Sequence, residues 1–191
     1  MTVVARSGGT GRDPARRATG PFTLRDGSRV DVRPIEPADA CRLRRMFERL
    51  SPASVYFRFF APIQRPRPGL LEHLASVDHD RREALVAVVD DEIVAVARYE
   101  GGSTGEAAEL AVTVEDAWQR RGLGAFLSRR LAGLARSRGF TAFRASVLGE
   151  NRAALALVQS LAPDADVRFG SGQYGVYVPL RAATDERSRV R

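Results

Sequence analysis

Short apolar runs with the period of β-strands recur along most of the chain. These runs lie at 84–89, 93–99, 107–114 and 142–148, with two shorter ones near 167–169 and 174–180. Before them, residues 22–24 and 29–35 flank Asp26-Gly27, a dipeptide typical of tight hairpin turns. The pattern predicts an opening β-hairpin, then a meander formed by the three runs from 84 to 114.

Helical spacing of apolar residues separates these strands. A helix is predicted after Pro37, with an apolar face made of Ala40, Leu43, Phe47 and Leu50. A second short helix is expected to begin at Ser51-Pro52, since serine caps helices and proline suits their first turn. Further helices are predicted at 70–77, 122–137 and 151–161. Helices mixed into a largely antiparallel sheet indicate the α+β class.

The two ends of the chain lack such periodicity. Residues 1–20 are rich in Arg and Gly, residues 182–191 are similarly polar, and both are predicted to be flexible tails. A single domain is therefore expected at 21–181. The sequence contains neither an apolar stretch of about 18 residues nor the apolar block of a secretory leader. A cytoplasmic protein that does not enter a membrane is expected.

The net charge of +7 first points to a polyanionic partner, but its distribution weakens that interpretation. Residues 21–180 hold 22 arginines against 20 acidic residues, so most of the excess lies in the two ends. Nucleic-acid binding is therefore the weakest of the functional hypotheses. All 30 basic residues are arginine, and the single cysteine, Cys41, excludes an internal disulfide and a cysteine-cluster zinc site.

One segment between a predicted strand and a predicted helix has the composition of an anion-binding turn. It reads Gln119-Arg120-Arg121-Gly122-Leu123-Gly124. Glycines in such a turn permit close approach of a ligand, and a helix start offers free amides and partial positive charge. A pyrophosphate is a suitable ligand for such a turn. Short motifs of this kind occur easily by chance, so the signal lies in the position of this one between an apolar strand and an amphipathic helix.

With its surroundings, this segment resembles the GNAT family of acyl-CoA-dependent N-acyltransferases. The resemblance follows residues 108–161 through strand, pyrophosphate loop, helix, strand and helix. The segments 30–40, 51–60 and 77–89 are also similar to the catalytic domain of bacterial protein lysine acetyltransferases. The resemblance implies a mixed, mostly antiparallel central sheet flanked by helices, with acetyl-CoA as acyl donor and no metal.

The family pattern assigns a set of residues to the acyl donor. It implies that Gln119, Arg120, Arg121, Gly122, Leu123, Gly124 and Ala125 surround the pyrophosphate of coenzyme A, mainly through backbone amides. The exposed edge of 110–114 would pair with the pantetheine arm, with Val112 and Val114 making the backbone contacts. Asn151 either contacts the cofactor or the substrate arm, or simply caps its helix.

Transfer to an amine requires a base, because a lysine amine is almost wholly protonated at neutral pH. Glu109 is the candidate, since it lies in an otherwise apolar strand where burial would raise its pKa, and a glutamate at the matching place is the base in the similar lysine acetyltransferases. The alternatives are that Glu109 only begins the strand at its wet end, or that the nearby Glu106 is the base.

The chain departs from the family pattern where many members carry a tyrosine that protonates the leaving thiolate. That position is Val158, and Tyr174 and Tyr177 remain as possible replacements, although core packing is the simpler role for both. Two other candidates, a metal site and a nucleophilic Cys41, are not favoured. The metal-like cluster comprises His73, Asp78, His79 and Asp80.

These patterns favour an acetyl-CoA-dependent N-acetyltransferase in which a primary amine attacks the thioester directly. A protein lysine is the favoured acceptor, and the resemblance points to acyl-CoA synthetases among the protein substrates. Two alternatives stay open: a small-molecule amine as acceptor, and a non-catalytic sensor of acyl-CoA.

Overall fold

The central sheet has eight strands in the order β1-β2-β3-β4-β5-β6-β8-β7. The computed structural model describes residues 19–102 and 106–180. Every neighbouring pair of strands is antiparallel except β5 and β6, which are parallel. The strands are β1 Gly20–Thr23, β2 Arg29–Pro34, β3 Arg82–Val89, β4 Glu92–Gly101, β5 Ala107–Val114, β6 Ala142–Leu148, β7 Asp166–Gly170 and β8 Gln173–Pro179. The predicted α+β class, opening hairpin and meander are confirmed.

The helices lie where the sequence predicts them, with small differences at their ends. They are α2 Ala40–Arg49, α3 Pro52–Phe59, α4 Leu70–Ala75, α5 Leu123–Ser137 and α6 Arg152–Leu161, with short 3₁₀ turns at Pro37–Asp39 and Asp116–Trp118. The helix predicted at 70–77 ends two residues early. Ser51 caps α3 by accepting a hydrogen bond from the Ser54 amide, as its position predicts.

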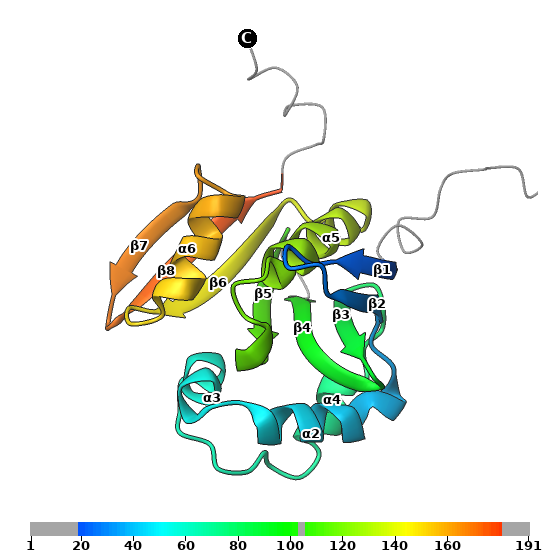
Figure 1. Cartoon of the computed structure of the whole chain (residues 1–191). Coiled ribbons are helices and arrows are strands. Elements are labelled where there is room, and N and C mark those ends of the chain that lie inside the picture. The colour runs from blue at the N-terminus through cyan, green and yellow to red at the C-terminus, as the bar shows by residue number, and fades with distance from the viewer. Residues whose placement is uncertain (1–18, 103–105, 181–191) are drawn as a thin grey trace, which may run out of the picture.

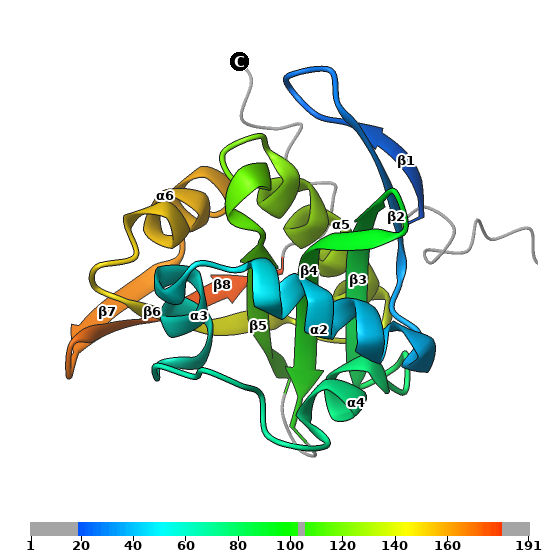
Figure 2. The same ribbon diagram turned by 60° about the horizontal axis from the view of Figure 1, so that its bottom comes forward.

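Helices cover both faces of the sheet, and the sheet divides the core into two halves (Figure 1). On one face α5 buries Leu123, Leu127 and Leu131 against β3, β4 and β5. On the other face α2 and α4 pack against β3 and β4, and Figure 2 shows α2, α3 and α4 together on that side. The β4 strand is buried between the two layers, as its near-continuous apolar run requires.

The predicted tails fall almost entirely outside the described residues, which begin at Thr19 and end at Leu180. Of the residues assigned to the first tail, Gly20 begins β1. Within 19–102 and 106–180, no helix combines the length and apolarity that crossing a bilayer requires.

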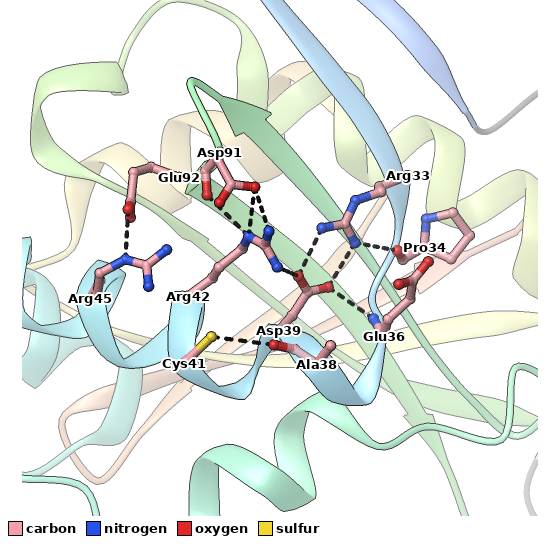
Figure 3. Close-up of polar contacts among 10 residues, drawn as sticks. All are labelled: Arg33, Pro34, Glu36, Ala38, Asp39, Cys41, Arg42, Arg45, Asp91 and Glu92. Carbon is pink, nitrogen blue, oxygen red and sulfur yellow. Dashed lines mark hydrogen bonds and ion pairs between the residues drawn. The ribbon is translucent and has the colours of Figure 1, made fainter.

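A buried carboxylate joins α2 to the sheet (Figure 3). Asp39 is only 1% exposed and accepts two hydrogen bonds of 2.7 Å from the Arg33 guanidinium and one of 2.9 Å from the Glu36 amide. Arg42 connects the same carboxylate to Asp91 in the β3–β4 turn. These bonds fix the start of α2, which covers one face of the sheet.

We expect Asp39→Asn to destabilise the fold by about 3 kcal/mol, because removing one charge leaves Arg33 paired with a neutral amide in a buried site. Burial opposes ionisation of Asp39, but hydrogen bonds from Arg33 and Glu36 outweigh it and hold its pKa below the ordinary value. This stabilisation is therefore present at neutral pH and is lost as the pH falls through the folded-state pKa.

Urea unfolding at pH 7 and in an acidic series measures both effects. Asp31→Asn is the matched control, because Asp31 is an exposed aspartate on the neighbouring strand β2. Equal unfolding free energies for Asp39→Asn and Asp31→Asn would contradict the role given to this network.

Candidate functional site

The parallel strands β5 and β6 pair only at their beginnings and then separate. Their register runs through Ala107 to Glu109 on β5 and Ala142 to Arg144 on β6. Beyond Glu109, the β5 residues have backbone partners only on β4 within the described part of the chain, while β6 continues along β8. The edge of β5 from 110 to 114 is therefore a strand edge that an extended ligand can pair with.

Glu109 lies where the two strands part. It is the last β5 residue paired with β6, and its side chain is exposed, so the expectation that Glu109 is buried is wrong. The strand is apolar in sequence, but this end of it emerges from the core. Glu106, the alternative carboxylate, is also exposed and precedes β5, where its carbonyl accepts a hydrogen bond from Thr141.

Two further charged residues flank Glu109 in register. Glu100 lies opposite on β4, and Arg144 lies opposite on β6. Side chains directly opposite on antiparallel strands have Cβ atoms about 4.5–5.5 Å apart, so Glu100 is a second carboxylate beside the first. Glu100 was missed by the sequence analysis because its neighbourhood depends on strand register, which a single sequence does not show.

The start of α5 presents free amides toward the separated strands. Gly122 precedes the helix with φ +92°, a left-handed conformation that favours glycine. No side chain of the described residues caps the helix, so the amides of Leu123, Gly124 and Ala125 have neither intrahelical nor capping partners. An anion is favoured at this position by these donors and by the helix dipole.

The side chains of the predicted anion-binding segment have several different roles. Arg120 is exposed and has φ +59°, whereas Leu123 is 1% exposed and belongs to the core. Arg121 forms a 2.9 Å ion pair with Asp26 of the β1–β2 turn and stacks 5.0 Å from the ring centroid of Trp118. The free backbone amides and the exposed Arg120 are therefore the groups of this turn that are available to an anion.

Gln119 joins the turn to its surroundings. Its amide nitrogen donates to the Val114 carbonyl at 3.0 Å and to the Ser54 hydroxyl at 3.2 Å. Ser54 in turn donates to Asp116 at 2.9 Å. The side chain thus fixes the end of β5 relative to α3, a positioning role that the motif alone did not predict.

Gly124 lies where α5, β5 and α6 converge. A Cβ added there would lie 3.6 Å from side-chain carbons of Val114 and Leu157, and 3.7 Å from Val112. Val112 and Val114 therefore point toward α5, while their backbone lies on the edge of β5 that β6 leaves unpaired and where Gln119 occupies the Val114 carbonyl. The residues predicted to contact the acyl donor through the loop and the strand are thus close neighbours.

Asn151 caps α6. Its side-chain oxygen accepts a hydrogen bond of 3.0 Å from the Ala154 amide. Of the two roles considered for Asn151, the capping role is present in the structure. The cost of losing such a cap is about 1 kcal/mol, which makes Asn151 a structural residue whatever else it contacts.

The metal-like cluster has other partners. His79 Nδ1 lies 2.9 Å from a Glu83 carboxylate oxygen, and the other oxygen of Glu83 accepts from Arg138 at 2.9 Å. Among the described residues, no group of three or more His, Cys, Asp or Glu side chains forms a candidate metal site. Cys41 is exposed, and its thiol donates to the Ala38 carbonyl at 3.4 Å.

The tyrosines considered as proton donors lie on β8. Tyr174 packs against Phe169, with ring centroids 4.8 Å apart. Tyr177 is 40% exposed and lies opposite Arg144 of β6, which in turn lies opposite Glu109 of β5. Strand β6 therefore stands between Tyr177 and Glu109. Val158 occupies a half-buried position on α6.

Comparison with known proteins relates this arrangement to one family. The model of the acetyltransferase (GNAT) family matches residues 44–162. An acetyltransferase of Pseudomonas aeruginosa is 38% identical over 135 residues, which are 69% of this chain and 73% of that protein. The acetyltransferase Pat of Mycolicibacterium smegmatis is 33% identical over 138 residues, which are 70% of this chain but only 40% of that longer protein.

A solved structure shows the same fold. The GNAT domain of S. lividans PAT has a TM-score of 0.79 and 30% identity, and the match covers 85% of this chain and 97% of that one. The separated strands, the glycine-bearing helix start and the family match agree. The chain therefore belongs to the GNAT family of acetyltransferases.

Proposed function

We propose that this chain transfers an acetyl group from acetyl-CoA to a primary amine, and that the favoured acceptor is a lysine side chain of a protein. The observation that carries the proposal is the free β5 edge beside the uncapped start of α5. A strand edge suits the extended, amide-bearing pantetheine arm, and the helix start suits a pyrophosphate. The two lie next to each other at Gly124.

The residues present fit coenzyme A on both counts. Backbone amides of Gly122, Leu123, Gly124 and Ala125 would bind the pyrophosphate, with the exposed Arg120 adding positive charge. The backbone of Val112 and the amide N–H of Val114, whose carbonyl accepts from Gln119, would pair with the pantetheine amides. When bound, acetyl-CoA supplies a thioester, whose carbonyl is open to attack by an amine.

Glu109 is the proposed general base. It would accept the proton that the attacking amine loses as the new N–C bond forms and the C–S bond breaks. A strand amide near Val112 would donate a hydrogen bond to the carbonyl oxygen as negative charge develops there. The exposure of Glu109 and its position at the parting of β5 and β6 give an amine arriving from solvent access to this carboxylate.

The choice of a protein lysine rests on similarity to the PAT domain and to Pat, and on the front segments that resemble lysine acetyltransferases. The test is a filter assay with labelled acetyl-CoA and candidate protein substrates, including acyl-CoA synthetases. We expect label on lysine side chains. Release of coenzyme A with small amines, and no label on any protein, would instead favour the small-amine alternative.

The absence of lysine gives a further prediction. Because all 30 basic residues are arginine, the α-amino group is the only primary amine of this polypeptide. Prolonged incubation with acetyl-CoA is therefore expected to add at most one acetyl group that withstands hydroxylamine. Intact-mass measurement checks this, and a second stable adduct would contradict the proposed amine specificity.

A further inference from the structure

A cavity lies on the face of the sheet that carries α2, α3 and α4. Its volume is about 60 Å³. Judged by the volume that one buried water requires, a cavity of this size holds roughly four water-sized groups, or one carboxylate with the methylene that bears it. The wall is mainly apolar and includes Leu43, Phe47, Leu50, Leu74, Ala111 and Thr113. Two arginines, Arg58 and Arg98, also line this cavity.

Arg98 is the more buried of the two. Its residue is 6% exposed, and one terminal nitrogen, Nη1, donates to the Leu74 carbonyl at 3.1 Å. The other, Nη2, is buried and has no hydrogen-bond partner among the described residues. Burial, reinforced by the charge of Arg58, lowers the pKa of Arg98 to about 10, so this guanidinium remains charged at neutral pH.

Arg58 brings a second positive charge to the same wall. It comes from α3, lies 5.1 Å from the ring centroid of Phe59, and makes no ion pair with any described carboxylate. Burial lowers the pKa of Arg58, and the charge of Glu109 acts in the opposite direction. Two like charges therefore face an apolar cavity, and no carboxylate of residues 19–102 or 106–180 is bound to either.

The cavity adjoins the proposed catalytic carboxylate. Side chains alternate along a strand, so Glu109 points to the same face of β5 as Ala111 and Thr113, which line the cavity. Across the β4–β5 ladder, Arg98 lies opposite Ala111, and Glu100 lies opposite Glu109. One step of two residues, about 7 Å, separates the position of Glu109 from that of Ala111.

A buried guanidinium with one unpartnered terminal nitrogen in an apolar wall is costly unless an anion satisfies that donor. Arginine binds carboxylates with paired hydrogen bonds, and the size of the cavity suits one such group. We propose that this cavity is a subsite for a carboxylate carried beside the reacting centre, with Arg98 as its main ligand and Arg58 as the second. The location beside the reacting amine rests on the proposed function.

The carboxylate has two possible sources in the reaction. It belongs either to the amine acceptor, as an acidic side chain next to the lysine or the carboxylate of an amino acid, or to the transferred acyl group of a dicarboxylic acyl-CoA. The chemistry that Arg98 and Arg58 recognise is the same in both.

Direct binding tests the subsite without requiring turnover. Glutarate and its uncharged diamide, glutaramide, are titrated into the wild type, Arg98→Met and Arg168→Met by ligand-observed NMR. Arg168 is the matched control, because it is an arginine with an 84% exposed side chain on β7. We expect glutarate to bind at least tenfold more tightly than glutaramide in the wild type and Arg168→Met, and the difference to vanish in Arg98→Met.

Turnover then identifies the source. One arm compares lysine peptides with Glu or Gln beside the acceptor, and amino acids with their amides. The other compares succinyl-CoA with acetyl-CoA on an uncharged acceptor. A tenfold preference for the charged substrate of a pair supports the subsite if it is lost in Arg98→Met and reduced in Arg58→Met. The arm that shows this preference identifies whether the carboxylate belongs to the acceptor or to the acyl group.

The outcomes separate the two proposals. Glutarate binding that depends on Arg98, without turnover on any acceptor, supports the subsite and refutes the proposed function. Efficient acetylation with equal rates for charged and neutral partners, and no glutarate binding, overturns the subsite and leaves the proposed function standing. Arg58→Met provides the same binding test if Arg98→Met does not fold.

Discussion

Glu109→Gln is expected to lower kcat/KM for acetyl transfer at least 100-fold while leaving acetyl-CoA affinity within twofold of the wild type. General-base catalysis contributes typically about 10²- to 10⁴-fold, and glutamine keeps the shape of the side chain while losing the ability to accept a proton. Glu109 is exposed, so the substitution leaves the core untouched. Stopped-flow or steady-state release of coenzyme A, together with calorimetric titration of acetyl-CoA, measures both quantities.

Two matched variants make this test selective. Glu106→Gln removes an exposed carboxylate three residues earlier, outside β5, and is expected to retain full activity. Glu100→Gln removes the cross-strand neighbour of Glu109 and is expected to change the rate by less than about tenfold. Wild-type turnover in Glu109→Gln, with the large loss in Glu100→Gln or Glu106→Gln instead, would reassign the base.

Gly122→Ala is expected to weaken acetyl-CoA binding at least tenfold. Gly122 has φ +92°, and an L-residue there costs about 1–2 kcal/mol, which the turn relieves by rotating away from the left-handed region. That rotation moves the amides of Leu123 and Gly124, which are proposed to bind the pyrophosphate. Tenfold in affinity corresponds to about 1.4 kcal/mol, which is within the strain introduced.

Gly139→Ala is the control for that strain. Gly139 has φ +85° just beyond the other end of α5, and a Cβ added there meets nothing within 4 Å. Both variants should lose similar unfolding free energy, but only Gly122→Ala should lose affinity for acetyl-CoA in a calorimetric titration. An equal loss of affinity in both would mean that α5 stability, and not the geometry of its first turn, controls binding.

Most of the fold could be predicted from the sequence because its elements have strong local signals. The apolar runs of the meander are long and broken by only single charged residues, and Asp26-Gly27 and Ser51-Pro52 are clear turn and cap signals. The ends of helices were predicted less accurately, since the helix expected at 70–77 ends at Ala75. The choice between residues that end a helix depends on tertiary contacts that one sequence does not contain.

The candidate site was predicted less completely, for a physical reason. The glycine-bearing turn is a local feature, so Gly122 and Gly124 could be found from their spacing and context. The parting of β5 and β6 is a property of strand register, and it determines that Glu109 is exposed although its strand is apolar. Register also places Glu100 beside it, which spacing along the chain does not reveal.

Arg98 illustrates the same limit. A single arginine interrupts the apolar run of β4, which is the one sequence signal it gave. Only the packing of α2, α3 and α4 over this face of the sheet shows that the guanidinium lines a cavity and has one donor without a partner among the described residues. Gln119 is the reverse case, since the motif located it but the structure gives its side chain a bracing role between β5 and α3.

A crystal structure of the chain with acetyl-CoA tests the central claim most directly. The account predicts the pyrophosphate within hydrogen-bond distance of the amides from Gly122 to Ala125, the pantetheine arm along the β5 edge at Val112 and Val114, and the thioester on the side of Glu109. A cofactor bound elsewhere, or one whose thioester lies beyond the reach of an amine held at Glu109, would contradict it.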